Sequence, residues 1–153
     1  MAADDLADYV AISRLQHAYA DTVTRQAWAE LAELFLPGCP ITLDLRTGTD
    51  LHCVGPAELG TFIAAAIQRF DFFEFAILSS VVDTSDASDD IATGRTYICE
   101  LRRDAGTGAF SQAFGLYQDE YARAGHRWWF ARRRYVSLAR NDGELTAFPI
   151  PPR

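Results

Sequence analysis

The stretch that decides the fold is Ala109–Leu138, with the sequence AFSQAFGLYQDEYARAGHRWWFARRRYVSL. Two long segments within it, Ala109–Arg123 and Trp128–Leu138, alternate between bulky and polar side chains and lie on either side of Gly125. Aromatic and β-branched residues at period two, joined through a glycine turn, are typical of an antiparallel hairpin. The second half of the chain is therefore expected to be built from long paired strands.

Residues outside this hairpin add more strands and three helices. The further strand segments are Pro40–Arg46, Leu51–Val54, Phe72–Val82 and Ile91–Arg103. The helical segments run from Asp4 or Asp5 to about Thr24, over Gln26–Phe35, and from Gly55 to Ile67. This order predicts an α+β fold, in which three helices from the N-terminal half pack on a strongly bent antiparallel sheet of about six strands. A cone-shaped α+β barrel of this kind encloses a natural pocket for a small molecule.

Length and composition limit the classes of protein to which the chain can belong. Its 153 residues, 49% of them hydrophobic, suit one domain over 1–153, with a core over about 8–138 and a tail over 139–153. The net charge is −7 and every basic residue is arginine, so we expect no nucleic-acid partner. The apolar runs are too short to span a membrane, and residues 1–5 lack the pattern of a secretory signal.

The three cysteines are odd in number and widely spaced, at Cys39, Cys53 and Cys99. They form no CxxC pair and no Cys/His ligand spacing. We therefore expect free, buried thiols in a cytoplasmic protein and no bound metal.

Several short motifs occur together and in a particular order. They are Ile12-x-x-Leu15 with Ala18-Tyr19-Ala20, Trp28-x-x-Leu31-x-x-Leu34-Phe35, Gly55-Pro56-Ala57-Glu58-Leu59, Tyr117-x-Asp119-x-Tyr121, and Gly125-x-x-Trp128-x-Phe130-Ala131 with Arg133. In this order they resemble the nuclear-transport-factor-2-like superfamily, whose members are also called SnoaL-like, ketosteroid-isomerase-like or scytalone-dehydratase-like. The resemblance covers about residues 8–138. It implies the fold more than the function, because this fold carries enzymes, binding modules and structural subunits.

The resemblance also implies candidate catalytic residues. Tyr19 is similar in placement to the tyrosine that ketosteroid isomerases use as an oxyanion donor, and Asp119 to their neutral aspartic acid. Asp44 lies within one residue of their general base, an offset that matters because a slip of one residue turns a strand side chain to the other face. The catalytic sets of the dehydratase and dehydrochlorinase relatives are largely missing. In particular, no histidine stands where those enzymes have one.

Alternation supports part of this assignment and leaves other interpretations open. Tyr117, Asp119 and Tyr121 share one face of a strand, and the two tyrosines indicate that this face is the inner one. Burial would then keep the Asp119 carboxyl neutral by raising its pKa, as in the bacterial isomerase that illustrates this effect. Asp44 shares its face with Arg46, so a solvent-facing or arginine-paired Asp44 is the simpler alternative.

The Arg132–Arg134 run bears directly on Asp119, because alternation sends at least one of these side chains inward. An inward arginine either contacts an anionic ligand, a role for which we name Arg132, or neutralises Asp119. In the second case Asp119 stays ionised, and the neutral-acid mechanism fails.

Apolar side chains are expected to form the remaining ligand contacts. Phe73 and Phe75 belong to a phenylalanine-rich stretch that suits an apolar pocket wall or a dimer face, and does not suit a sugar or phosphate site. With Tyr117, these phenylalanines are the predicted ligand-binding residues.

Two functions remain open from the sequence. The first is a cofactor-independent lyase or isomerase that acts on a small apolar carbonyl compound, such as a steroid or polyketide. The second is a non-catalytic ligand-binding or structural module, which the missing histidines favour. The resemblance also implies a homodimer, with Trp128 or Trp129 as exposed aromatic candidates for its interface.

Overall fold

Long strands make up most of the computed structural model, which describes residues 3–141 and 143–152. The elements are α1 (Ala3–Thr24), the 3-10 helix η1 (Trp28–Glu33), β1 (Pro40–Asp44), β2 (Leu51–Val54), α2 (Gly55–Ile67), β3 (Phe70–Asp83), the 3-10 helix η2 (Ala87–Asp89), β4 (Ile91–Asp104), β5 (Phe110–Ala124), β6 (Arg127–Asn141) and β7 (Leu145–Ala147). The expected order of helices and strands is confirmed. The second predicted helix is shorter than expected and is a 3-10 helix.

The strands form one sheet in the order β2-β1-β6-β5-β4-β3, and the short β7 pairs with the end of β6. The sheet is mixed and not purely antiparallel, because β1 runs parallel to β6, with Ile41 opposite Arg133. The parallel pairing follows from the connection made by α2, which joins β2 at one edge of the sheet to β3 at the opposite edge. Three antiparallel steps then return the chain beside β1 in the same direction. Since β2 and β3 are the two ends of this order, the described strands form an open cone and not a closed barrel.

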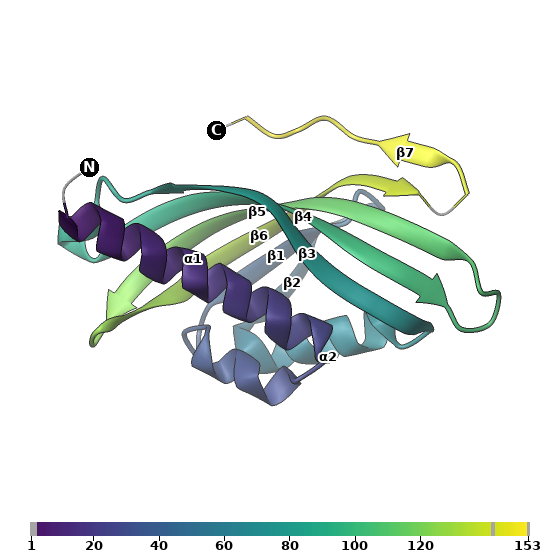
Figure 1. The fold of residues 1–153 in the computed structure, drawn as a ribbon, viewed down its shortest axis with the longest axis horizontal. Helices are drawn as coiled ribbons and strands as arrows, with labels where there is room; N and C mark the ends of the chain where they lie inside the picture. The colour runs from purple at the N-terminus through teal and green to yellow at the C-terminus, as the bar shows by residue number, and fades with distance from the viewer. Residues whose placement is uncertain (1–2, 142, 153) are drawn as a thin grey trace.

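The helices cover the concave side of the sheet (Figure 1). Helix α1 lies along β3 and β6, while α2 lies beside η1 and the β1–β2 hairpin. The buried side chains of α1, Ile12, Leu15, Tyr19 and Val23, recur every three or four residues, so they form one stripe that faces the sheet. That stripe, together with the inward-facing aromatic residues of β5 and β6, forms the core.

Irregular pairing bends the sheet around α1. Register shifts occur in β3 between Ile77 and Ser79, and in the β5–β6 pair at Phe114/Gly115 and Glu120/Tyr121. A shift of this kind changes which residues face inward and increases the local twist. The sheet can therefore curve over a cavity while its large aromatic side chains still point inward.

The outer face of the sheet is partly covered by the segment that follows β7. Arg95 donates hydrogen bonds to the carbonyls of Pro151 and Pro152 at 2.8 and 2.9 Å, and Arg46 donates one to Pro149 at 3.3 Å. Leu116 and Val136 face outward by alternation, yet they are fully buried. Figure 1 shows this segment running back over the sheet.

The aromatic candidates for a dimer interface differ from expectation. Trp128 is buried, and its indole N–H donates to Asp8 Oδ1 at 2.9 Å, while Trp129 is half-buried. The homodimer itself stays a prediction. Cys39, Cys53 and Cys99 are free and buried, as expected. No helix within residues 3–141 or 143–152 is long and apolar enough to span a membrane.

A glycine on the inner face of β5 makes room for a tyrosine ring from the neighbouring strand. A Cβ at Gly115 would lie 2.1 Å from Cε2 and 2.6 Å from the hydroxyl of Tyr135. We therefore expect Gly115→Ala to displace this ring and to lower the free energy of unfolding by about 1–3 kcal/mol. Urea denaturation measures the change. Gly38→Ala is the matched control, because no atom lies within 4 Å of a Cβ there, and equal losses in both variants would contradict the prediction.

Candidate active site

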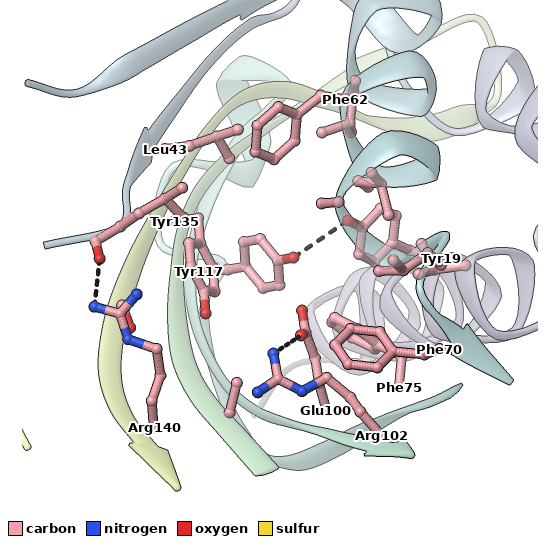
Figure 2. A pocket seen from close by; sticks show the side chains of 18 residues that line it. Tyr19, Leu43, Phe62, Phe70, Phe75, Glu100, Arg102, Tyr117, Tyr135 and Arg140 are labelled. Atoms are coloured by element: carbon pink, nitrogen blue, oxygen red, sulfur yellow. Dashed lines mark hydrogen bonds and ion pairs between the residues drawn. The ribbon is translucent and has the colours of Figure 1, made fainter. Parts of the chain in front are cut away.

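A cavity of about 210 Å³ lies between the inner face of the sheet and the two α-helices, and it opens to solvent on one side. Most of its wall is apolar (Figure 2). The lining residues are Tyr19, Val23, Leu43, Leu45, Leu59, Phe62, Ile63, Ala66, Ile67, Phe70, Phe75, Glu100, Arg102, Ala113, Tyr117, Tyr135, Ser137 and Arg140. A concave apolar site with a few polar groups is the usual form of a small-molecule site.

Two tyrosines form a pair of linked phenols on the cavity wall. The hydroxyls of Tyr19, from α1, and Tyr117, from β5, lie 3.2 Å apart. Burial raises the pKa of Tyr19, and it raises that of Tyr117 well above the ordinary value of 10.0. Both phenols therefore stay neutral, and one can donate to a ligand while it accepts a hydrogen bond from the other.

Glu100 is the only carboxylic acid among the cavity-lining residues that the structure describes. It points inward from β4, opposite Phe75 on β3 and Ala113 on β5. About 23% of its side chain is open to the cavity, while protein surrounds the rest. Burial raises the pKa of Glu100, and the positive charge of Arg102, 3.6 Å away, partly offsets the effect. A carboxyl with a raised pKa in a cleft is a candidate acid or base.

Three further polar side chains line the same cavity. Arg102 donates from Nε to Ser111 Oγ at 3.2 Å, and Arg140 donates from Nη2 to the carbonyl of Leu45 at 2.8 Å. The Tyr135 ring comes from β6, the same strand as Arg140, and burial raises the pKa of its phenol. Figure 2 shows Tyr135, Arg102 and Glu100 around the same open space as Tyr117.

A buried ion pair lies behind the two phenols, at the narrow end of the cone. Arg133 on β6 donates to both carboxylate oxygens of Asp119 on β5, at 2.7 and 2.9 Å. Gln16 from α1 accepts from Arg133 at 3.0 Å and donates to Asp119 at 2.6 Å, and the Tyr121 hydroxyl also donates to Asp119. Burial opposes the charge on Arg133, but Asp119 outweighs that effect and raises the arginine pKa.

Aromatic rings enclose the guanidinium of Arg133. Its central carbon lies 3.8 Å from the ring centroid of Tyr117, 4.1 Å from that of Phe130 and 4.3 Å from that of Tyr19. The Nη1 atom of Arg133 is buried and has no hydrogen-bond acceptor among the described residues. The negative faces of the surrounding aromatic rings can stabilise its N–H groups instead. The positive charge thus lies directly against the two phenols that line the cavity.

The predicted site residues separate into two groups. Tyr19, Tyr117 and Phe75 line the cavity, as the sequence predicted. Phe73 is buried in the core but does not line the cavity, and Arg132 points outward to Glu120 at 3.3 Å. The arginine that turns inward is the next residue, Arg133.

Neither predicted carboxylate reaches the cavity. Asp119 is held by Arg133 behind the phenols, which is the structural alternative to the neutral acid. Asp44 turns away from the cavity toward Arg134 and Arg46, at 3.3 and 3.5 Å, while its neighbours Leu43 and Leu45 line the wall. The one-residue offset noted in the sequence therefore places Asp44 on the other face of its strand.

Glu100 is the functional candidate that the sequence-based prediction missed. Alternation does not mark it, because in the strand Ile91–Arg103 the face of Glu100 carries Thr96 and Ile98, whereas the opposite face carries Tyr97, Cys99 and Leu101. The opposite face is at least as apolar, so the pattern alone does not tell which face lies inside. Arg102, two residues after Glu100, lies on the same face and also lines the cavity.

Taken together, these features define an α+β domain in which a carboxyl and a pair of phenols line an open cavity. The chain belongs to the SnoaL-like domain family, whose model matches residues 4–134. No match was found among curated proteins.

Solved structures with the same fold include three that cover nearly the whole chain. A putative scytalone dehydratase from Novosphingobium aromaticivorans is 19% identical, covers 94% of this chain and 92% of its own, and has a TM-score of 0.77. A LinA-type3 hexachlorocyclohexane dehydrochlorinase from Novosphingobium barchaimii is 18% identical over 97% and 98%, with a TM-score of 0.74. The Kfla4162 protein of Kribbella flavida is 20% identical over 90% and 95%, also at 0.74. At these identities the likeness shows the fold alone.

The Asp119–Arg133 pair is expected to stabilise the fold. Asp119→Asn leaves a buried guanidinium charge without its counter-charge, so we expect a loss of about 3–5 kcal/mol in the free energy of unfolding. Replacing both partners by apolar residues, as in Asp119→Leu with Arg133→Met, is expected to recover much of that loss. Urea denaturation measures both variants.

Glu120→Gln serves as the control, because it removes a carboxylate from the exposed pair with Arg132 on the same two strands. An Asp119→Asn variant no less stable than this control would show that the buried pair does not hold the narrow end together.

Proposed function

We propose that this protein is a cofactor-independent enzyme that moves a proton next to the carbonyl of a small, mostly apolar compound, in an isomerisation or a dehydration. The observation that carries the proposal is the position of the Glu100 carboxyl, whose pKa is raised by burial, in an apolar cavity that is also lined by the hydrogen-bonded phenols of Tyr19 and Tyr117. Glu100 replaces Asp44 and Asp119 in the role of acid and base.

Glu100 would act as the general base. Its carboxylate takes a proton from the carbon beside the carbonyl, and the electrons of that C–H bond form an enolate. A base works best when its pKa is near the working pH, so burial improves an ordinary glutamate. In an isomerisation Glu100 returns the proton to another carbon. In a dehydration it gives the proton to the departing β-hydroxyl, which leaves as water.

The phenols would stabilise the enolate oxygen. Tyr117 can donate to that oxygen while Tyr19 donates to Tyr117. Arg133 lies against both rings, so its charge makes each phenol a stronger donor without itself entering the cavity. The Asp119–Arg133 pair has a positioning role in this proposal.

The cavity volume limits the substrate to a compact one. An engineered apolar cavity of about 150 Å³ holds benzene. About 210 Å³ therefore suits a body of one or two rings that extends through the open side, which favours a small polyketide-like compound over a complete steroid.

A non-catalytic binding module is the second candidate. It is favoured by the fact that Asp44 and Asp119 both lie outside the cavity, and that none of the three histidines lines it. The two candidates differ in whether the chain turns over a bound carbonyl compound.

Proton exchange in D₂O tests the proposal across a panel of one- and two-ring ketones, unsaturated ketones and β-hydroxy ketones. We expect the protein to speed the loss of α-proton signals, followed by ¹H NMR, from at least one compound of this panel. Glu100→Gln should slow this exchange by about 10²–10⁴-fold, because it removes the base and keeps the shape.

Glu74→Gln is the matched control, because Glu74 lies on the adjacent strand with its side chain exposed. It should exchange protons at the wild-type rate. Tight binding of a panel compound without exchange in any variant would favour the binding module instead. If Glu100→Gln and Glu74→Gln slow proton exchange to the same extent, Glu100 is not the base.

The raised pKa of Glu100 also predicts a pH dependence of stability. The folded state disfavours the charged carboxyl, so wild-type stability falls as the pH rises from about 4.5, the ordinary pKa, through the raised value. Glu100→Gln has no such charge. The variant should therefore gain stability relative to wild type across this window, and the difference should then level off. Urea denaturation between pH 4 and 8 measures it, and a constant difference would contradict the raised pKa.

A further inference from the structure

We propose that Arg102 and Arg140 form a carboxylate-binding subsite at the rim of the cavity, and that the substrate is a small apolar carboxylic acid. This inference rests on the proposed function and deepens it by naming the substrate class. It concerns the polar part of the wall, while the apolar part holds the rings of the same molecule.

The two arginines face the same space from opposite sides of β5. On the inner face, Arg102 of β4 is opposite Ser111, and Arg140 of β6 is opposite Ala113. Strands that are two apart in a sheet lie about 10 Å from each other. At this point the strand between them carries only the small side chains of Ser111 and Ala113, and both arginines line the same cavity beside the Tyr135 phenol (Figure 2). We infer that a carboxylate bound there contacts both guanidiniums.

The guanidiniums of Arg102 and Arg140 are each held in place by contacts with the protein, and of the two only Arg102 lies close to a carboxylate that the structure describes. Ser111 accepts from Arg102, and Arg102 also lies over the Phe70 ring at 5.1 Å. Arg140 donates to the carbonyl of Leu45. Among the described residues, no carboxylate lies within ion-pair distance of Arg140, while Glu100 lies 3.6 Å from Arg102.

The charge balance of the cavity differs from that of the whole chain. The cavity-lining residues include two arginines and one acid, whereas the chain as a whole carries −7. A locally positive rim inside an acidic protein favours an anion only where the guanidiniums can contact it directly. Carboxylate suits the planar, forked donors of arginine.

Arginines with a structural role usually have matched partners, as others in this protein do. Arg103, the residue after Arg102, points outward and binds both oxygens of Asp71 at 2.8 and 3.1 Å. Arg123 is held by Asp8, by Asp90 and by the carbonyl of Ala87. Arg140 lines the cavity and has no such acidic partner among the described residues, since its guanidinium contacts the carbonyl of Leu45 and lies 5.5 Å from the centroid of the Phe148 ring.

Paired ligands separate charge recognition from apolar binding. We expect 1-naphthoate to bind wild-type protein about tenfold more tightly than 1-naphthamide in isothermal titration calorimetry, because a charged acceptor gains more from arginine than a neutral one. In the double variant Arg102→Gln with Arg140→Gln, the two ligands should bind with equal affinity. Arg103→Gln, on the outer face of the same strand, should keep the tenfold preference.

The single variant Arg140→Gln provides a test that does not require the double variant to fold. In this variant the preference for 1-naphthoate over 1-naphthamide should fall from about tenfold to about threefold or less. An equal affinity of the two ligands for wild type, or an unchanged preference in the arginine variants, would overturn the subsite. Glu100→Gln distinguishes this result from the proposed function. It should bind naphthoate at least as tightly as wild type, because it removes a nearby negative charge, even if proton exchange is lost or was never present.

Discussion

The buried pair between Asp119 and Arg133 constrains the rest of this structure. A guanidinium and a carboxylate removed from water are stable only when nearly all of their hydrogen bonds are made. Gln16 and Tyr121 supply the bonds that the two charges do not give each other, and aromatic faces cover the remainder of the guanidinium. Because these groups come from α1, β5 and β6, the pair ties the first helix to the centre of the sheet.

This pair also decides where the cavity can be. Its aromatic surroundings fill the space on one side of Tyr19 and Tyr117, and the cavity described above is lined by these two tyrosines. Two inward-facing carboxyls on neighbouring strands then have opposite environments. Asp119 is fully engaged by one arginine, whereas Glu100 has a single, longer contact with Arg102 and faces apolar walls. The contacts of Asp119 suit a carboxylate that positions other groups, whereas a carboxyl in an apolar cleft with a pKa raised by burial, such as Glu100, is a candidate acid or base.

Periodicity in the sequence was enough to predict the order of the main helices and strands and the inner face of β5, which carries Tyr117. It placed Tyr19 on the buried stripe of α1, while the choice of Tyr19 as a site residue came from the family resemblance. Periodicity could not predict which side chains point inward next to a register shift between strands. The register shift at Glu120/Tyr121 lies beside Arg132 and Arg133, and no residue type there marks it. The parallel β1–β6 pairing is equally absent from local pattern, because it depends on where α2 carries the chain. Alternation did not single out Glu100 either, because the face opposite to it carries Tyr97, Cys99 and Leu101 and is equally apolar, and the resemblance directed attention to aspartates at other positions.

Arg102 connects the proposed base to the proposed subsite. In the free protein its charge partly offsets the burial of Glu100 and so keeps the pKa of that carboxyl from rising further. When a substrate carboxylate contacts Arg102, part of this compensation goes to the ligand, and a second negative charge arrives near Glu100. Both effects raise the pKa of Glu100 and make it a stronger base while the substrate is bound. If both proposals hold, the arginine that selects the ligand also adjusts the pKa of the group that reacts with it, because Arg102 and Glu100 lie two residues apart on the same inner face of β4.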